Sequence, residues 1–286
     1  MTTLGVHAMV WVGGWSPDEA AYAMQKTADA GYGLIEIPVL EPENLDAGHT
    51  RRLLDEHGLA ASCSLGLTAD TDISSTDPAT VQRGEARLGA ALNFAAAVGA
   101  GFLTGVIFSA LGKYPGPASA EGRQNSVSAI RRLAEAAGPT GVSIGLEAVN
   151  RYETNVMNTA DETMVFIEEV GMDNVYAHLD TYHMNIEETS MRDAVLRCGD
   201  RLGYVHVGES HRGYLGTGSV DFPGLFGALS EAGYQGPVAF ESFSSAVVSP
   251  LLSNSLAVWR NLWDDSMDLA VSAREFVEKG LGTAEG

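Results

Sequence analysis

The sequence predicts a (β/α)8 barrel, formed as a single catalytic domain over residues 1–286. Short β-rich segments alternate with amphipathic helical segments about eight times, and no Pro/Ser-rich linker or change of composition interrupts them. Parallel strands joined by helical crossovers close into such a barrel, and 286 residues is an ordinary length for it. An open doubly wound sheet is the alternative, but "VWVGGWS" lacks the glycine spacing of a dinucleotide-binding loop.

Eight segments have the length and the apolar, β-branched content of buried strands. They are residues 4–11, 33–39, 61–67, 101–110, 143–149, 175–181, 204–210 and 237–243. Because helical segments separate them, neighbouring strands are expected to run parallel, with their carboxyl ends at one face of the barrel.

The helical segments carry start and stop signals. The clearest are 16–32, 47–60, 159–171, 221–234 and the tail 254–281. Residues 16–32 have Ser at the capping position, Pro at the first helical position and Gly at the exit. On the tail, Trp259 and Trp263 lie one helical turn apart, so they are expected to form an apolar stripe against the barrel or a second subunit.

The composition narrows the choice of partners and compartment. Lys and Arg number 17 against 37 acidic residues, a formal charge of −20, which disfavours nucleic acid and anionic membranes as partners. Two cysteines, Cys63 and Cys198, make no disulfide framework and point to a reducing compartment. The first residues lack the basic region of a signal peptide, and no apolar run reaches membrane-spanning length. We therefore expect a cytoplasmic protein.

Each of the last four predicted strands ends its apolar run with one side chain that can bind a metal ion. These side chains are Glu147, Asp180, His206 and Glu241. Strand alternation places all four on the barrel-facing side, at the face where barrel enzymes carry their active sites. Because isolated buried charges are costly, their convergence predicts a divalent cation among them. Three carboxylates and one imidazole favour Mn²⁺, Co²⁺ or Mg²⁺ over Zn²⁺.

The segment "LDTYHMNIEE" (179–188) allows a second interpretation of Asp180, as the N-cap of a helix. A metal ligand is favoured instead, because Glu147, His206 and Glu241 occupy the matching positions at the ends of their own strands. Glu187 and Glu188 are expected to open the next helix, where acidic residues suit the helix dipole. His178, just before the segment, is expected to be a buried side chain of the barrel interior rather than a ligand.

Four segments carry a resemblance to a known family: "LEAVNRYET" (146–154), "LDTYHMNIEE" (179–188), "VHVGESHRG" (205–213) and "FESF" (240–243). They resemble the ketose 3-epimerases, the group of D-tagatose, D-allulose and L-ribulose 3-epimerases within the xylose isomerase-like barrels. The resemblance runs from the first strand to the Trp-rich end of the chain. It implies one divalent ion per subunit, Mn²⁺ before Co²⁺ or Mg²⁺, and we expect a homodimer or homotetramer.

The resemblance also implies roles for individual residues. It makes Glu147, Asp180, His206 and Glu241 the metal ligands, with Glu147 and Glu241 doubling as the acid/base pair. It assigns Glu153, His183 and Arg212 to the O1–O3 end of the substrate. At the end of the first strand this chain has His7 where some members have an aromatic residue. We expect His7 and Trp11 to form part of the pocket wall, near the distal end of the sugar.

Inverting C3 of a ketose removes a proton from one face of the carbon and returns it on the other, through a cis-enediolate across C2 and C3. A divalent ion on O2 and O3 stabilises that charge, and two carboxylates on opposite faces exchange the base and acid roles. The expected substrates are free ketoses of the D-allulose/D-fructose, D-tagatose/D-sorbose and L-ribulose/L-xylulose type. Of the lysines Lys26, Lys113 and Lys279, only Lys113 follows a strand, which favours an unphosphorylated sugar.

Two other functions remain open at this point. An aldose–ketose isomerase on the same barrel would normally hold two ions and a lysine near the carbonyl. A non-catalytic sugar-binding barrel would give no function to the two inward glutamates, Glu147 and Glu241. The glycine-rich residues 213–219 could cradle a phosphate, since barrels often bind one after strands seven and eight, but a tight solvent turn is the favoured interpretation.

Overall fold

The computed structural model describes residues 2–284, in which β1 to β8 form one closed parallel barrel in chain order. The strands are β1 (Leu4–His7), β2 (Leu34–Pro38), β3 (Ala60–Ser64), β4 (Phe102–Thr104), β5 (Ser143–Ala148), β6 (Val175–Asp180), β7 (Leu202–Val207) and β8 (Val238–Phe240). The barrel closes where β1 pairs with β8, with Gly5 opposite Ala239. The predicted fold class is confirmed.

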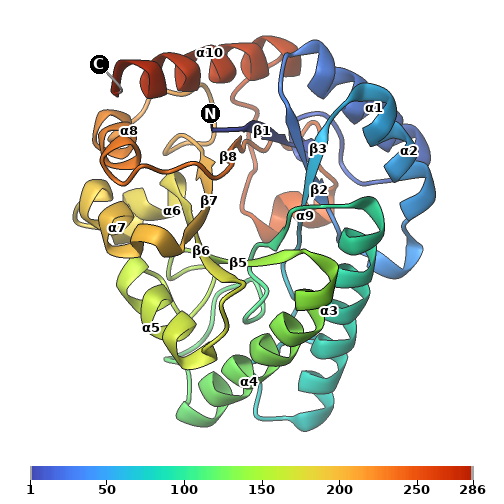
Figure 1. Ribbon diagram of the computed structural model, residues 1–286, viewed down its shortest axis with the longest axis vertical. Coiled ribbons are helices and arrows are strands. Elements are labelled where there is room, and N and C mark those ends of the chain that lie inside the picture. The colour runs from blue at the N-terminus through green and yellow to red at the C-terminus, as the bar shows by residue number, and fades with distance from the viewer. Residues whose placement is uncertain (1, 285–286) are drawn as a thin grey trace.

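Helices surround the barrel, and the short helix over Pro250–Ser255 lies inside the ring that the longer helices form (Figure 1). They are α1 (Pro17–Asp29), α2 (Ala47–His57), α3 (Pro78–Val98), α4 (Ala120–Ala137), α5 (Ala160–Val170), α6 (Thr181–Glu187), α7 (Met191–Cys198), α8 (Phe222–Glu231), α9 (Pro250–Ser255) and α10 (Ser266–Ala284). Capping boxes begin α1 and α5: Ser16 pairs with Glu19, and Thr159 pairs with Glu162. Across residues 2–284, none of the helices combines the length and the apolar character needed to span a lipid bilayer.

Several strands end earlier than the sequence predicts. Residues 4–11 were expected to be one strand, but β1 ends at His7, whose ring accepts the backbone N–H of Met9 and caps a short 3-10 helix over Ala8–Val10. Residues 101–110 contain only the short β4. Gly105 follows it with φ +106°, and a side chain there would meet the carbonyl oxygen of Leu65. The regular strand β4 therefore ends just before this glycine, and the rest of the segment keeps only local contacts with the chain after β3, such as the bridge between Leu67 and Ala110.

The predicted helix over 254–281 is wrong in its first half. The chain leaves α9 at Ser255 and begins α10 only at Ser266, and Ala257 between them has φ +54°. Trp259 is 73% exposed, whereas Trp263 is buried and donates its indole N–H to Oγ of Ser242 at 3.0 Å. The two tryptophans therefore do not form an apolar stripe on one helix.

The barrel interior is polar, whereas the layer between strands and helices is apolar. Side chains from strands that are not neighbours meet inside: Oγ of Ser62 lies 2.7 Å from the Tyr204 hydroxyl, and Oγ1 of Thr104 lies 2.8 Å from Nδ1 of His178. The rings of His178 and Tyr204 pack edge to face, with centroids 4.9 Å apart. This polar interior supports the groups that lie above it at the carboxyl ends of the strands.

Candidate active site

Four polar side chains converge at the carboxyl ends of β5 to β8. Glu147, Asp180 and His206 lie on β5, β6 and β7, and Glu241 directly follows β8; all four are buried. Nδ1 of His206 lies at the centre of the group. It is 3.5 Å from Oε1 of Glu147, 3.6 Å from Oδ2 of Asp180 and 3.5 Å from Oε1 of Glu241. The structure thus brings together the four residues that the sequence singled out.

This arrangement fits a divalent cation. Nδ1 of His206 and Oδ2 of Asp180 are buried and have no hydrogen-bond partner among the described residues. Ligand atoms that each lie about 2.1 Å from one ion are separated by roughly 3–4 Å, which is the spacing observed here. Asp180, His206 and Glu241 form one set of potential ligands, and Glu147 belongs to two neighbouring sets, with His178 and His206 or with Asp180 and His183.

Asp180 caps a helix with one carboxylate oxygen and turns the other toward His206. Its Oδ1 accepts the backbone N–H of Tyr182 at 2.5 Å, so the residue is the N-cap of α6. Its Oδ2 points to the shared position near His206. Burial alone would raise the pKa of Asp180, but the nearby charges of His183, His206 and Arg212 outweigh it and hold the pKa well below its usual value.

The two glutamates have different surroundings. Burial raises the pKa of Glu147, since no arginine or lysine pairs with its carboxylate among the described residues. Glu241 instead accepts from Nη1 of Arg212 at 2.5 Å. The Arg212 guanidinium lies 3.9 Å from the centroid of the Tyr182 ring and 4.9 Å from that of Phe243. These contacts fix the guanidinium beside Glu241.

The backbone of Arg212 is itself in an uncommon conformation. Its φ of +62° lies in the left-handed region, where a non-glycine residue is strained, and its N–H donates to the carbonyl oxygen of Glu209 at 2.8 Å. Such strain persists only where the surroundings over-determine the conformation, and it clusters at functional sites.

His183 and Glu153 lie beside the cluster and are linked by Asn150, which the sequence analysis missed. The Asn150 side-chain amide lies 2.9 Å from Oε1 of Glu153 and 2.8 Å from Nδ1 of His183, and its backbone N–H also donates to that Nδ1. Nδ1 of His183 is therefore an acceptor, so Nε2 carries the proton and faces Glu147 at 3.9 Å. The position of Asn150, directly after the "LEAV" strand end, is the signal that could have identified it.

A second carboxylate that the sequence analysis missed lies beneath the cluster. Glu36, in the middle of β2, is fully buried, and its Oε2 lies 2.7 Å from Nε2 of His206. Burial alone would raise its pKa, but His206 and His7 outweigh that effect and lower it. The sequence feature that could have identified Glu36 is its position as a lone glutamate inside the apolar segment 33–39.

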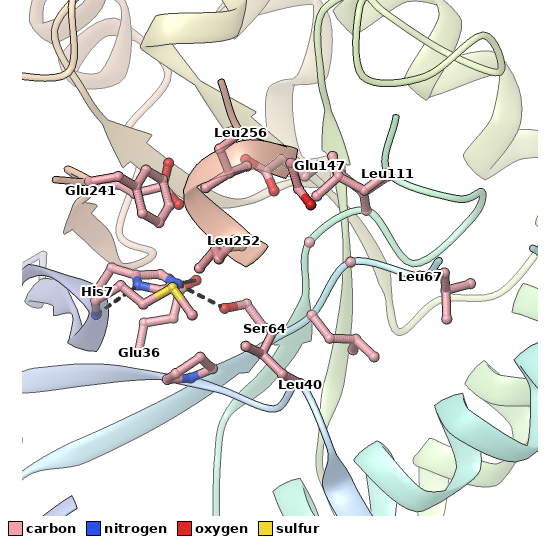
Figure 2. Close-up of a pocket in the computed structure, with 18 of the residues that line it drawn as sticks. His7, Glu36, Leu40, Ser64, Leu67, Leu111, Glu147, Glu241, Leu252 and Leu256 are labelled. Carbon is pink, nitrogen blue, oxygen red and sulfur yellow. Dashed lines mark hydrogen bonds and ion pairs between the residues drawn. The ribbon is translucent and has the colours of Figure 1, made fainter. Parts of the chain in front are cut away.

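The cluster opens into a cavity of about 640 Å³ (Figure 2). Polar groups line one part of it: Glu147, Glu153, His183, His206, Arg212 and Glu241 are among the lining residues. Leucines line it as well, including Leu40, Leu67, Leu111, Leu252 and Leu256, and Figure 2 draws Glu147 between Leu256 and Leu111. A cavity of this size, apolar in part with convergent polar groups, is typical of a small-molecule site.

His7 lines the cavity, as the sequence predicts. Its Nε2 lies 3.2 Å from Oγ of Ser64, a contact visible in Figure 2. The prediction that Trp11 also forms part of the pocket wall is wrong. Trp11 is buried in the hydrophobic core and donates its indole N–H to Oγ1 of Thr27 at 3.1 Å. The chain turns into a short helix after His7, so Trp11 points away from the cavity, and Trp15 lines it instead.

Leu252 and Leu256 belong to a small apolar cluster apart from the main core. Met9, Phe243 and Val248 form its buried part, and Leu252, Leu256 and Val258 pack against them. This α9 cluster therefore covers one part of the cavity with residues from α9 and its flanking loops.

Glu187 and Glu188 lie at the end of α6 and do not open the following helix. Oε2 of Glu187 pairs with Nη2 of Arg151 at 2.5 Å, and Oε1 of Glu188 accepts the backbone N–H of Ala160 at 2.7 Å. The next helix, α7, begins at Met191 and is capped by Ser190. The two acids thus connect α6 to the segments after β5.

The glycine-rich residues 213–219 hold a carboxylate of the chain itself. Oε2 of Glu209 accepts the backbone N–H of Gly216 at 2.9 Å, and its Oε1 accepts those of Ser210 and Val220 at 2.7 and 3.3 Å. These amides are therefore not free to cradle a phosphate. Lys113 is not among the residues that line the cavity; its ammonium lies 5.9 Å from the centroid of the Tyr152 ring.

Comparisons with known proteins show which family this chain resembles. A family model described as xylose isomerase-like TIM barrel matches residues 24–269. An L-ribulose 3-epimerase of Methylomonas sp. (strain DH-1) is 56% identical over 275 residues, which covers 96% of both chains. A ketose 3-epimerase of Arthrobacter globiformis is 50% identical over 278 residues, covering 97% of this chain and 96% of the relative. A crystal structure of a D-allulose 3-epimerase from Methylomonas sp. in complex with D-allulose matches with a TM-score of 0.96 at 56% identity, covering 97% of this chain and 96% of the other.

Proposed function

The chain belongs to the xylose isomerase-like TIM-barrel family and, within it, to the ketose 3-epimerases, which are isomerases; from this premise we propose a metal-dependent inversion of C3 in free ketoses. The observation that carries the proposal is the convergence of Glu147, Asp180 and Glu241 within 3.6 Å of one imidazole nitrogen of His206. Three buried carboxylates gathered around one nitrogen repel one another, and of the three only Glu241 has an arginine partner among the described residues, so a divalent cation would relieve this repulsion.

In this proposal Glu147, Asp180, His206 and Glu241 hold one divalent ion. The donor set of three carboxylates and one imidazole suits Mn²⁺ first, with Co²⁺ or Mg²⁺ as alternatives. When bound, the ion acts as a Lewis acid that stabilises negative charge on the O2 and O3 atoms of the sugar. The unpartnered Oδ2 of Asp180 and Nδ1 of His206 support this assignment.

Glu147 and Glu241 are proposed to move the proton at C3. They come from β5 and β8, which are not neighbours in the barrel, so their carboxylates approach the shared position from different sides. One removes the C3 proton and leaves an enediolate across C2 and C3 of the sugar. The other returns a proton to the opposite face, and the roles exchange with the direction of reaction.

Three further residues are proposed to hold the O1–O3 end of the sugar. Nε2 of His183 carries a proton that it can donate, and Arg212 presents a guanidinium that contacts two aromatic rings. Glu153 lines the same cavity and offers a carboxylate acceptor. At the distal end, His7 and the leucines of the cavity are proposed to contact the rest of the chain of an unphosphorylated ketose.

The test is incubation of the metal-loaded protein with D-fructose, D-tagatose and L-ribulose in D₂O. Chromatography should resolve the C3 epimers as products, and NMR should place deuterium at C3 with none at C1. An aldose product with label at C1 or C2 would instead indicate an aldose–ketose isomerase. Binding without turnover of any of these ketoses would indicate a sugar-binding barrel.

Three expectations about the assembly and its location are also proposals. Residues 1–286 are proposed to act as one catalytic domain, and the protein is proposed to form a homodimer or homotetramer. Sedimentation analysis of the purified protein measures the subunit count directly. The cytoplasm is the proposed location, to be checked by cell fractionation.

A further inference from the structure

Glu36 is a buried carboxylate that has no role in the reaction proposed above. It lies in the middle of β2, and its side chain reaches across the barrel interior to His206 on β7. In the barrel, β1 and β8 separate these two strands. The carboxylate is fully buried, as is the imidazole that it contacts.

The contacts of Glu36 are concentrated on one of its oxygens. Oε2 lies 2.7 Å from Nε2 of His206 and accepts from the Tyr204 hydroxyl at 2.8 Å. Oε1 has no hydrogen-bond partner among the described residues, and the nearest basic group is Nε2 of His7 at 3.5 Å. A buried carboxylate with one unpartnered oxygen is expensive to keep, so a contribution to folding alone does not account for it.

The contact determines which nitrogen of His206 carries a proton. An ionised carboxylate only accepts hydrogen bonds, so Nε2 of His206 must donate to it. In the neutral imidazole the other nitrogen, Nδ1, then has a free lone pair. Nδ1 is the atom that faces Glu147, Asp180 and Glu241.

We propose that Glu36 is a positioning residue that holds His206 in the tautomer and ring orientation needed for Nδ1 to bind the metal ion. A carboxylate behind a metal-binding imidazole fixes its ring and raises its basicity, and loss of such a partner typically costs about 10–100-fold in metal affinity. This inference rests on the proposed function, because it presupposes the ion at Nδ1.

The surrounding hydrogen bonds provide a matched control. Tyr204 donates to the same oxygen of Glu36 and lies 2.7 Å from Oγ of Ser62, but it forms no hydrogen bond to His206 that would fix the tautomer. Tyr204→Phe therefore perturbs the same buried network and leaves the carboxylate–imidazole contact in place. Glu36→Gln removes the charge at nearly constant volume, and because its amide can present either an acceptor oxygen or a donor NH2 to Nε2, it no longer dictates the tautomer. Glu36→Asp keeps the charge but shortens the reach by one methylene.

The experiment titrates Mn²⁺ into each metal-free variant and follows the free ion by electron paramagnetic resonance. Glu36→Gln should raise the Kd by about 10–100-fold, whereas Tyr204→Phe should change it by less than about 3-fold. The zero-field splitting of bound Mn²⁺ should change only in the Glu36 variants, because it reports the geometry of the ligands. Melting temperatures of the metal-free proteins show whether each variant is folded.

An unchanged Kd in Glu36→Gln, with normal binding by the unmodified protein, would overturn the inference and leave the proposed function intact. Mn²⁺ binding that is equally weak in Glu36→Gln and Tyr204→Phe would also overturn the inference, because a general disturbance of packing would then explain both results. If Glu36→Gln does not fold, Glu36→Asp decides: a raised Kd supports the inference and a normal Kd contradicts it. Failure of the unmodified protein to bind Mn²⁺ would contradict the proposed function itself.

Discussion

Arg212 and Glu241 form a buried ion pair in which Glu241 also faces the candidate metal position. Nη1 of Arg212 lies 2.5 Å from Oε2 of the carboxylate, and the other oxygen, Oε1, lies 3.5 Å from Nδ1 of His206. One oxygen of this carboxylate therefore pairs with the guanidinium, and the other faces the candidate metal position. Glu147 has no such arginine among the described residues, so the two glutamates of the site are not equivalent.

Arg212→Ala should impair turnover by about 100-fold or more while Mn²⁺ still binds. The variant removes the donor that holds Glu241, but it removes none of the four proposed ligands. Steady-state kinetics and a Mn²⁺ titration on the same sample measure the two effects. Arg212→Lys is the control: it keeps the charge but loses the planar group that contacts Tyr182 and Phe243, so it should recover only part of the rate. Loss of Mn²⁺ binding in Arg212→Ala would contradict this separation.

Removal of metal with a chelator should abolish turnover, and Mn²⁺ or Co²⁺ should restore it. Binding only to the folded protein stabilises it by about 2.7 kcal/mol when free metal is 100 times the Kd. Calorimetric scans should accordingly show a melting temperature higher by roughly 5 °C with saturating Mn²⁺. Full activity of protein shown to be metal-free by elemental analysis would refute the metal dependence.

Asp180→Asn and Asp180→Ala separate the capping role of Asp180 from its proposed ligand role. Asparagine caps helices about as well as aspartate, so Asp180→Asn should keep the bond to Tyr182 and the stability of the metal-free protein. Asp180→Ala should lose about 1 kcal/mol of stability with the cap. Both variants should weaken Mn²⁺ binding by more than the roughly 10–100-fold that is typical when a residue that only contacts a metal ligand is lost. Urea unfolding and Mn²⁺ titration provide the two measurements, and tight Mn²⁺ binding by both variants would rule out the ligand role.

Glu147→Gln and Glu241→Gln should each reduce kcat by at least about 10²–10⁴-fold, the typical contribution of a general acid or base. Each change removes a proton acceptor and a charged ligand together. Deuterium incorporation at C3 in D₂O should fall in parallel with product formation. Near-normal rates in either variant would show that the two-carboxylate assignment is wrong.

Glu187→Gln should destabilise the protein more at pH 7 than at pH 4. The hydrogen bonds from Arg151 lower the pKa of Glu187 in the folded protein. The ionised side chain therefore adds to the free energy of unfolding, and this contribution is fully present above the unfolded pKa of about 4.3. It is lost as the pH falls through the folded pKa. Urea unfolding of both proteins at the two pH values measures the difference, with Glu135→Gln, an exposed position on α4, as the control. An equal effect at both pH values would contradict the role of the charge.

The sequence predicted the barrel and the four converging groups because both depend on local patterns. Each of Glu147, Asp180, His206 and Glu241 ends an apolar run, and in a parallel barrel such ends meet at one face. Glu36 was missed because it stands inside an apolar run, and its partner His206 lies 170 residues further along the chain. No local pattern connects two such positions.

The tail was predicted wrongly because helical spacing of apolar residues does not show where a helix stops. Trp259 and Trp263 have that spacing, but Ala257 adopts a left-handed conformation just before them. Asn261 accepts the hydroxyls of Ser244 and Ser245 at 2.9 Å, which ties this segment to the loop after β8. These contacts are tertiary, so they outweigh the local periodicity.

The α9 cluster has a consequence for how the cavity wall can be changed. Its residues pack mainly on one another and stand apart from the main core, while Leu252 and Leu256 line the cavity. A substitution at either leucine therefore reshapes the cavity wall without opening a void under the barrel strands. Under the proposed function, exchange of these two side chains should therefore shift the preference among ketoses without displacing the four groups at the strand ends.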